Sequence, residues 1–187
     1  MTTRIDIFYA SHDGHTLKIA RFIEKILSGA FDGEVALHSA ECPDLACERI
    51  GQDSFTVVIA PIRYGFPLRE AETFLRANKA RIAPERLAML LVCLTARKPN
   101  RQTVETNGYL RKWLARHDLR PAIAASIAGK LDYPIYRPFD RFMIRLIMTM
   151  SRGPTDPSTQ IEFTDWDQVE ALSQEIARLA KGAHAPA

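Results

Sequence analysis

Residues that can bind a phosphate group follow the first apolar segment of the chain, Ile5–Tyr9. They are Ser11, His12, Asp13, Gly14, His15 and Thr16, and a helical pattern begins directly after them. A turn between a strand and a helix offers backbone amides, hydroxyl groups and the positive end of a helix dipole, which together suit a phosphate dianion. Neither GxGxxG nor GxxxxGK[ST] is present, so the loop favours FMN over NAD or ATP. A capped helix after a polar turn is the alternative.

Two further loops carry residues that can bind a flat ring. The first follows the apolar segment Thr56–Ala60 and reads Pro61, Ile62, Arg63, Tyr64 and Gly65. The second lies at the end of Ala88–Leu94 and reads Leu94, Thr95, Ala96, Arg97 and Lys98. Tyr64 can stack on a heteroaromatic ring, and Arg63 or Arg97 can place a cation where a reduced flavin carries negative charge. A turn with a packing tyrosine is the alternative for the first loop.

These loops must be positioned by strands and helices whose patterns are visible in the sequence. Short apolar runs predict five strands, at Ile5–Tyr9, Glu34–His38, Thr56–Ala60, Ala88–Leu94 and Ala122–Ala128. Helical spacing predicts helices at Thr16–Leu27, Arg69–Lys79 and Asn107–His117. The strands are almost continuously hydrophobic, which indicates a parallel sheet covered on both faces, a doubly wound α/β sandwich. In such a fold the three loops meet at one carboxyl edge of the sheet, where ligands bind.

A last helix is expected to start near Thr164 or Asp165 and to run to about Lys181. Either residue can cap its first turn, with Gln168 closing a capping box. The chain has 187 residues, of which 47% are hydrophobic, and no linker divides it, so we expect one domain over 1–182 and a frayed tail over 183–187.

Charge and cysteine content exclude several classes of protein. A net charge of +3 is too small to indicate nucleic-acid binding. The histidines show no metal-ligand spacing, so no metal site is expected. The chain opens without a secretory signal, and its three cysteines form no CxxC pair, which favours reduced thiols in the cytoplasm.

The stretch from about 130 to 157 does not fit the alternation of strands and helices. From Arg137 to Arg152 its apolar residues alternate with arginines at i, i+4 and i+8, namely Arg137, Arg141 and Arg145. Such a basic amphipathic helix is too short to span a bilayer but can lie in the membrane interface, with its apolar side inserted. The apolar residues assigned to this role or to substrate contact are Phe142, Ile144, Leu146 and Ile147. A surface helix that covers the sheet edge is the alternative.

At this point the chain resembles a known family, the flavodoxin-like menaquinone-dependent protoporphyrinogen IX dehydrogenases of heme biosynthesis. The resemblance covers nearly the whole chain. Its motifs are Ser11–Thr16, Ile62–Gly65, Ala96–Pro99, Thr106–Asn107 with Tyr109, Tyr133–Arg137, Asp140–Met148 and Thr164–Trp166. The Asp140–Met148 stretch is the most specific of them, because ordinary flavodoxins lack that insertion.

The resemblance implies a five-stranded parallel sheet of order 2-1-3-4-5 in a three-layer flavodoxin-like sandwich, with the insertion after the last strand. It also implies FMN, with Ser11–Thr16 at the phosphate and the loops around Tyr64 and Thr95–Arg97 at the ring. Hydrogen would be removed from protoporphyrinogen IX and the electrons passed to menaquinone or ubiquinone. Because the flavin performs this chemistry, no catalytic side chain is expected, only support from Arg63 or Arg97. Lys98, Arg137 or Arg141 would pair with the substrate's propionates.

The family's pattern commonly has a histidine after the RYG motif, whereas this chain has Phe66, so a proton-handling histidine is not expected there. The protein would be peripheral, on the cytoplasmic face of the bacterial inner membrane, and homo-oligomerisation is left open. Two other functions stay open on the same fold. One is a flavodoxin-type electron carrier, which the positive net charge disfavours, and the other is an NAD(P)H:quinone reductase.

Overall fold

The computed structural model describes residues 4–41, 50, 53–150 and 152–182. The predicted frayed tail over 183–187, Cys42 and Cys47 lie outside the described residues. The strands are β1 Arg4–Tyr9, β2 Glu34–Ser39, β3 Ser54–Arg63, β4 Phe66–Pro67, β5 Leu87–Val92, β6 Ile123–Ile127, β7 Lys130–Asp132 and β8 Gln160–Glu162. The α-helices are α1 His15–Ala30, α3 Arg69–Asn78, α4 Gly108–His117, α5 Pro138–Met150 and α6 Trp166–Gly182.

Five of the strands form one parallel sheet in the order β2-β1-β3-β5-β6. Counted among the parallel strands alone, this is the predicted order 2-1-3-4-5. The prediction lacked β4, which returns antiparallel along the end of β3. A strand of two residues is too short to show any hydrophobic period, so the sequence carried no signal for it.

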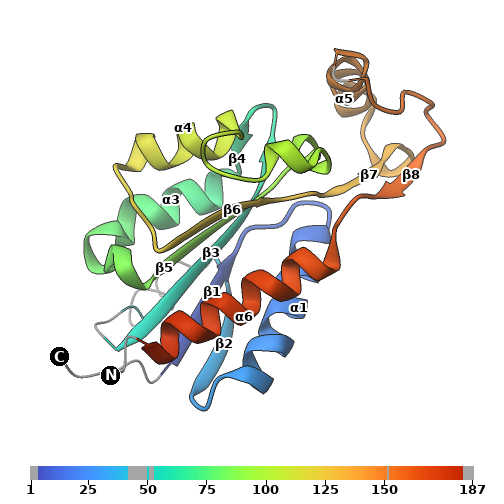
Figure 1. Ribbon diagram of the computed structural model, residues 1–187. Helices are drawn as coiled ribbons and strands as arrows, with labels where there is room; N and C mark the ends of the chain where they lie inside the picture. The colour runs from blue at the N-terminus through green and yellow to red at the C-terminus, as the bar shows by residue number, and fades with distance from the viewer. Residues whose placement is uncertain (1–3, 42–49, 51–52, 151, 183–187) are drawn as a thin grey trace.

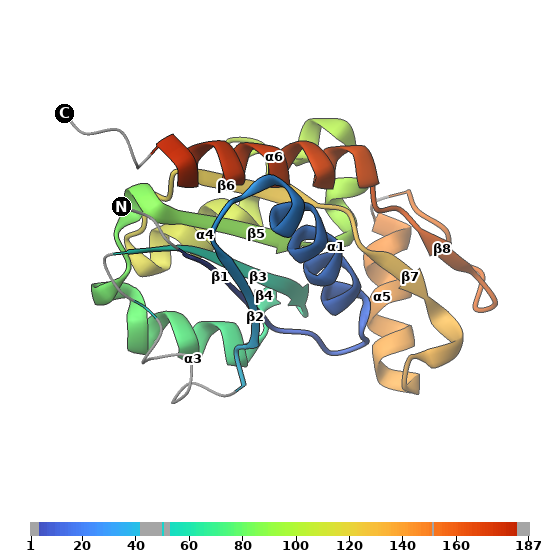
Figure 2. The same cartoon turned by 90° about the horizontal axis from the view of Figure 1, so that it is seen from below.

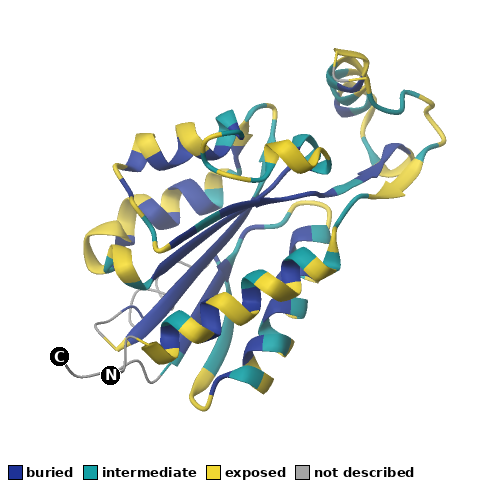
Figure 3. Cartoon of the chain, viewed as in Figure 1, coloured by how far each residue is buried: buried dark blue, intermediate teal, exposed yellow. Residues whose placement is uncertain are grey.

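Helices cover both faces of the sheet, as the hydrophobic strands predict (Figures 1 and 2). Successive strand residues point to opposite faces, so β3 contributes Val57 and Ile59 to one core and Val58 and Ala60 to the other. The first core is closed by α1 and α6, and the second by α3 and α4. Figure 3 shows the strands as the most buried part of the molecule, between helices whose outer faces are exposed. The sandwich therefore holds the carboxyl ends of β1, β3 and β5 rigidly side by side.

After β6 the chain leaves the sandwich and forms an arm beyond the carboxyl edge of the sheet (Figure 1). Strands β7 and β8 pair antiparallel at the base of the arm, and α5 stands at its end. Leu131, Tyr133 and Met148 form a small buried cluster between the hairpin and α5. The predicted helix is confirmed, and it stands over the carboxyl edge of the sheet at a distance that leaves a cavity between them. Among the described residues, no helix has the length and apolarity that a membrane span needs.

The start of α6 confirms one capping prediction and corrects another. Asp165 caps the helix, since its Oδ1 accepts the Gln168 amide at 3.1 Å. The capping box is wrong, because the Gln168 side chain turns to the sheet and donates to the Ser126 carbonyl at 3.2 Å. The hydroxyl of Thr164 likewise donates to Ala128 at 2.8 Å and is not available as a cap. Both side chains tie the beginning of α6 to the end of β6.

Candidate functional site

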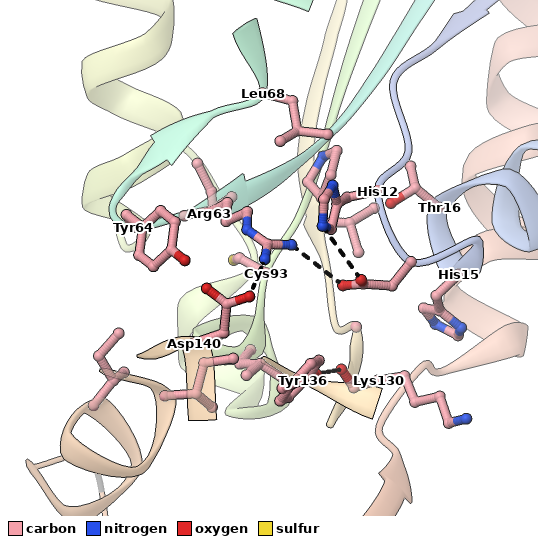
Figure 4. A pocket seen from close by; sticks show the side chains of 18 of the residues that line it. His12, His15, Thr16, Arg63, Tyr64, Leu68, Cys93, Lys130, Tyr136 and Asp140 are labelled. Atoms are coloured by element: carbon pink, nitrogen blue, oxygen red, sulfur yellow. Dashed lines mark hydrogen bonds and ion pairs between the residues drawn. The ribbon is translucent and has the colours of Figure 1, made fainter. Parts of the chain in front are cut away.

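A cavity of about 200 Å³ lies between the carboxyl edge of the sheet and α5. Five parts of the chain line it: the β1–α1 loop, the end of β3 with the segment through Leu68, the end of β5, Tyr109 of α4, and the arm that carries α5. Each of the three loops predicted to bind the cofactor contributes to the wall, and the inserted segment closes it. Figure 4 shows their side chains converging on one space.

The β1–α1 loop places the first turn of α1 at the cavity. Gly14 precedes the helix with φ of +79°, a left-handed conformation that a residue without a Cβ adopts without strain. The Ser11 hydroxyl accepts the Leu17 amide at 3.4 Å, and Thr16 is buried in the wall. The first amides of a helix have no partner within it, so those of His15 and Thr16 are donors for an anion.

His15 joins this loop to the segment that precedes α6. Its Nε2 lies 2.7 Å from the Thr164 hydroxyl, which donates its own proton to Ala128. Nε2 must therefore carry the proton and donate to Thr164. Burial lowers the pKa of His15, against the opposing charge of Glu162. The ring is thus held neutral, and it positions the loop without supplying a full positive charge.

The turn between β3 and β4 presents Tyr64 at the cavity mouth. Tyr64 and Gly65 both have positive φ, 51° and 85°, which is the pattern of a tight type I′ hairpin turn. Tyr64 is 46% exposed, with its ring 6.1 Å from that of Phe139 on α5. The predicted ring-binding tyrosine is therefore exposed and held in a constrained turn beside the inserted helix.

Arg63 bridges the sheet edge and α5 through the cavity. Its Nη2 donates to Asp140 Oδ2 at 2.5 Å, and its Nη1 lies 3.7 Å from Asp13 Oδ2 (Figure 4). The Asp140 side chain is 8% exposed and that of Arg63 is 23% exposed, so water screens the pair poorly. A single guanidinium thus connects the β3 turn with both the β1–α1 loop and the inserted helix.

The arm supplies the side of the cavity that faces the sheet edge. Asp132 Oδ2 accepts from Lys130 at 2.5 Å, whereas its Oδ1 is buried with no hydrogen-bond partner among the described residues. The Tyr136 hydroxyl accepts the Asp132 amide at 3.1 Å and donates to the Lys130 carbonyl at 3.3 Å. Burial raises the pKa of Tyr136, so its hydroxyl keeps its proton. Asp132 Oδ1 is therefore an acceptor that a bound donor group can satisfy.

The structure brings together most of the residues predicted for the cofactor. Those that line the cavity are His12, Asp13, His15, Thr16, Pro61, Ile62, Arg63, Tyr64, Gly65, Leu94 and Thr95. Ser11 and Gly14 shape the loop behind the wall, and Ala96 is fully buried in the core. Arg97 turns away from the cavity, because its Nη1 donates to the Leu94 carbonyl at 2.9 Å and its guanidinium lies beside Gly153.

The residues predicted for substrate or membrane contact divide into four groups. Ile144 and Ile147 line the cavity, whereas Phe142 and Leu146 are exposed on the outer side of α5. Arg137 and Arg145 are exposed, but Arg141 donates to the carbonyls of Tyr133 and Pro134. Lys98 lies outside the cavity, in a neighbouring hollow.

Sequence reasoning did not assign several lining residues to the site. They are Leu68, Val92, Cys93, Tyr109, Gly129, Lys130, Asp132, Ile135, Tyr136, Asp140 and Met143. For Lys130 and Asp132 a signal was present, since charged residues directly after the last predicted strand lie at the carboxyl edge.

Known proteins similar to this chain have a flavodoxin domain, in agreement with the observed fold. Residues 6–158 match the flavodoxin domain family. The chain is 39% identical over 176 residues to the protoporphyrinogen IX dehydrogenase [quinone] of Escherichia coli (strain K12), covering 92% of this chain and 94% of the relative. It is 31% identical to the protein of the same name from Leishmania major, covering 92% of this chain and 74% of that one. A flavodoxin from the domain Archaea shares the fold, with a TM-score of 0.52, 14% identity, and coverage of 95% of this chain and 99% of that one. The chain belongs to the family of the quinone-dependent protoporphyrinogen IX dehydrogenases, which are built on a flavodoxin domain.

Proposed function

We propose that this protein binds FMN and oxidises protoporphyrinogen IX to protoporphyrin IX with a quinone as acceptor. The observation that carries the proposal is the identity to the dehydrogenases over nearly the full length of both chains, together with a flavodoxin-type cavity closed by α5. Menaquinone is the acceptor that the resemblance favours.

The cavity fits FMN on features of its own. The first turn of α1 offers free amides for the phosphate, after a glycine in the left-handed conformation. The exposed ring of Tyr64 offers a stacking surface. Asp132 Oδ1 needs a hydrogen-bond donor, and FMN carries ribityl hydroxyls and a ring N–H. The phosphate donors, the stacking ring and the buried acceptor all line the same space.

Bound FMN supplies the two-electron redox chemistry, so the side chains need only bind, orient and exclude water. Met143, Ile144 and Ile147 of α5 form an apolar wall that keeps water from the site. Arg63 is a cation in the cavity wall, but Asp140 and Asp13 compensate its charge, so it would stabilise a ligand that becomes more negative on reduction only by giving up one of these partners. Without a histidine after the RYG motif, protons released by the substrate must leave through other groups, and Asp13 and His12 are two exposed titratable groups at the cavity.

The direct test is anaerobic. The FMN-loaded protein is mixed with protoporphyrinogen IX while flavin absorbance is followed, and a menaquinone analogue is then added while porphyrin fluorescence is followed. Flavin bleaching followed by quinone-dependent porphyrin formation is expected. A flavin that stays oxidised with the porphyrinogen but bleaches with NADPH refutes the proposal in favour of an NAD(P)H:quinone reductase. Repeating the second step with ubiquinone compares the two acceptors.

The same proposal includes a membrane surface as the place of reaction, because both the quinone and the porphyrinogen are lipophilic. Four large apolar side chains on one side of α5 are 46–80% exposed: Phe139, Phe142, Leu146 and Met150. Soluble proteins rarely expose such a contiguous stripe without a partner. Arg137 and Arg145 flank it, which suits anionic headgroups at the cytoplasmic face of an inner membrane. Because the adjacent face of α5 lines the cavity, the site would open next to the acyl boundary.

Vesicle partition tests this part separately. The double variant Phe142→Glu/Leu146→Glu should lose binding to phosphatidylglycerol vesicles while it retains FMN, since neither side chain lines the cavity. Ile161→Glu, at an exposed apolar position on β8, serves as the control. Wild-type partition of the double variant would reject the membrane surface.

A further inference from the structure

A second hollow of about 500 Å³ adjoins the cofactor cavity. Thr95 and Tyr109 line both spaces, so the two hollows meet at these residues. The hollow lies between the loop after β5, the start of α4 and Met150 at the end of α5. Its size is within the range of small-molecule sites, roughly 300–1,000 Å³.

Among the described residues, every charged side chain that lines the hollow is positive. Arg97, Lys98, Arg101 and Lys112 contribute to its wall, and no acidic residue does. Within the described part of the chain, neither Lys98 nor Lys112 takes part in an ion pair or a side-chain hydrogen bond. Like charges that share one hollow repel each other, and an anion relieves that repulsion. We call this hollow, defined by these four side chains, the basic basin.

A buried side chain holds the basin in shape. Asn107 is 2% exposed, and its Oδ1 accepts the amides of Tyr109 and Leu110 as the N-cap of α4. Its Nδ2 donates to the Arg101 carbonyl at 2.9 Å and to Cys93 Sγ at 3.4 Å. All the hydrogen-bonding capacity of this amide is used within the protein. The basin is therefore a built feature of the fold, and its cations project from fixed backbone.

We propose that the basic basin binds the carboxylate side chains of the substrate, with Lys98 and Lys112 as the residues that select a dicarboxylate. This inference rests on the proposed function, because it assigns the polar end of the same substrate. Protoporphyrinogen IX is an apolar macrocycle with two propionates on one edge. Beside the basin stands an apolar surface that begins at Met150 and continues along α5. An amphiphilic ligand can thus rest its macrocycle toward the cavity while its carboxylates reach the cations.

The arginines of α5 are less suited to this task. Arg141 is engaged with two backbone carbonyls. Arg137 and Arg145 are exposed, and neither lines the cofactor cavity or the basin. Lys98 and Lys112, by contrast, converge on one space from two different elements. Lysine ammonium groups on flexible stems can follow propionate arms that rotate freely.

The test compares the diacid substrate with its dimethyl ester, which keeps the macrocycle and removes both charges. The variants are Lys98→Glu, Lys112→Glu and the double variant, and Lys25→Glu on the exposed face of α1 is the control for one charge reversal. The first readout is the ratio of kcat/KM for protoporphyrinogen IX to that for its dimethyl ester. Charge-assisted contacts predict that the ratio falls about tenfold in the double variant. Lys25→Glu should keep the wild-type ratio.

A second readout needs no turnover. Binding of protoporphyrin IX and of its dimethyl ester to the FMN-loaded protein is followed by quenching of tryptophan fluorescence, and the double variant should lose affinity for the diacid selectively. A wild-type ratio and wild-type diacid affinity in the double variant would overturn the inference. The charge reversals could instead lower partition into phosphatidylglycerol vesicles and leave the kcat/KM ratio of diacid to dimethyl ester unchanged. That result would assign the basin to lipid headgroups and would also overturn the inference. If the wild type oxidises neither substrate, the proposed function fails, and the binding readout still decides on the basin.

Discussion

The Arg63–Asp140 ion pair predicts a specific asymmetry between its two partners. The Asp140 side chain is 8% exposed and, among the described residues, pairs with Arg63 alone, whereas Arg63 also has Asp13 at 3.7 Å. Asp140→Asn keeps an oxygen that accepts from Arg63 and removes only the charge. The loss is the difference between a charge-assisted and a neutral hydrogen bond, about 1–1.5 kcal/mol. Arg63→Gln instead leaves a buried carboxylate without its cation, which costs about 3–5 kcal/mol in buried pairs.

The exposed outer face of α5 means that this cost appears as local opening of the helix. Amide hydrogen exchange of the first hydrogen-bonded amides of α5, beginning at Arg141 next to Asp140, is therefore the assay. Asp140→Asn should speed exchange about tenfold, and Arg63→Gln by about two to three and a half orders of magnitude, up to complete loss of protection. The double variant should exchange more slowly than Arg63→Gln alone, because no charge is then left unpaired. Arg145→Gln, an exposed position on the same helix, is the control.

Two results would refute this reasoning. If Asp140→Asn opens α5 as much as Arg63→Gln does, the difference in burial between the partners has no energetic consequence. If the double variant is the least protected of the three, the pair is not the link that holds α5, and the apolar contacts of the arm must hold it.

Three further outcomes follow from single positions. Gly65→Ala should cost about 1–2 kcal/mol of unfolding free energy, because φ is +85°, and should weaken FMN binding in a titration of the apoprotein. Trp113→Phe should cost less than about 1 kcal/mol by urea unfolding, against about 3–5 for Trp113→Ala, since the buried indole N–H has no partner in the described structure. Burial lowers the pKa of His15 and of His117 below 6.5, so the unfolded chain binds more protons just below that pH. Stability should then fall as pH drops from 6.5, by at most about 1.4 kcal/mol per pH unit for each histidine, and His117→Gln should flatten the dependence of Tm on pH.

The fold was predictable because its signals are local and repeated. Continuous apolar runs such as Leu87–Val92 are buried on both faces, and this burial is the reason they read as parallel strands. The predicted helix limits agree with the observed ones where a period of 3.6 residues is preceded by a capping residue, as at Asn107 before α4. The hairpin of β7 and β8 was missed because strands of three residues carry no measurable alternation, and all of β8 is exposed.

The part of the candidate site formed by the sheet-edge loops could be predicted from the sequence, whereas the part formed by the arm could not. Loops after parallel strands must meet at one edge, so His12, Tyr64 and Thr95 could be brought together from the sequence alone. The direction of the arm is set by tertiary contacts such as the Tyr133 hydroxyl on the Pro154 carbonyl, at 2.9 Å. Periodicity showed that the inserted segment was a helix, but it could not show which side of an almost uniformly apolar helix faces the cavity.

The inserted helix presents different side chains on different faces, which an irregular loop would not do in a regular way. Successive residues of an α-helix turn by 100°, so Met143 and Ile147 can line the cavity while Phe142 and Leu146 face outward. Under the proposed function, the helix would give a lipophilic substrate an apolar wall on the side that lines the cavity and would place an apolar surface against the membrane on its exposed side. Asp140, on the inner side, ties this element to Arg63 at the cofactor turn. Under the proposed function, a flavodoxin domain would gain its substrate site from one helix added beyond the sheet edge, while the layers that hold the cofactor loops stay as they are.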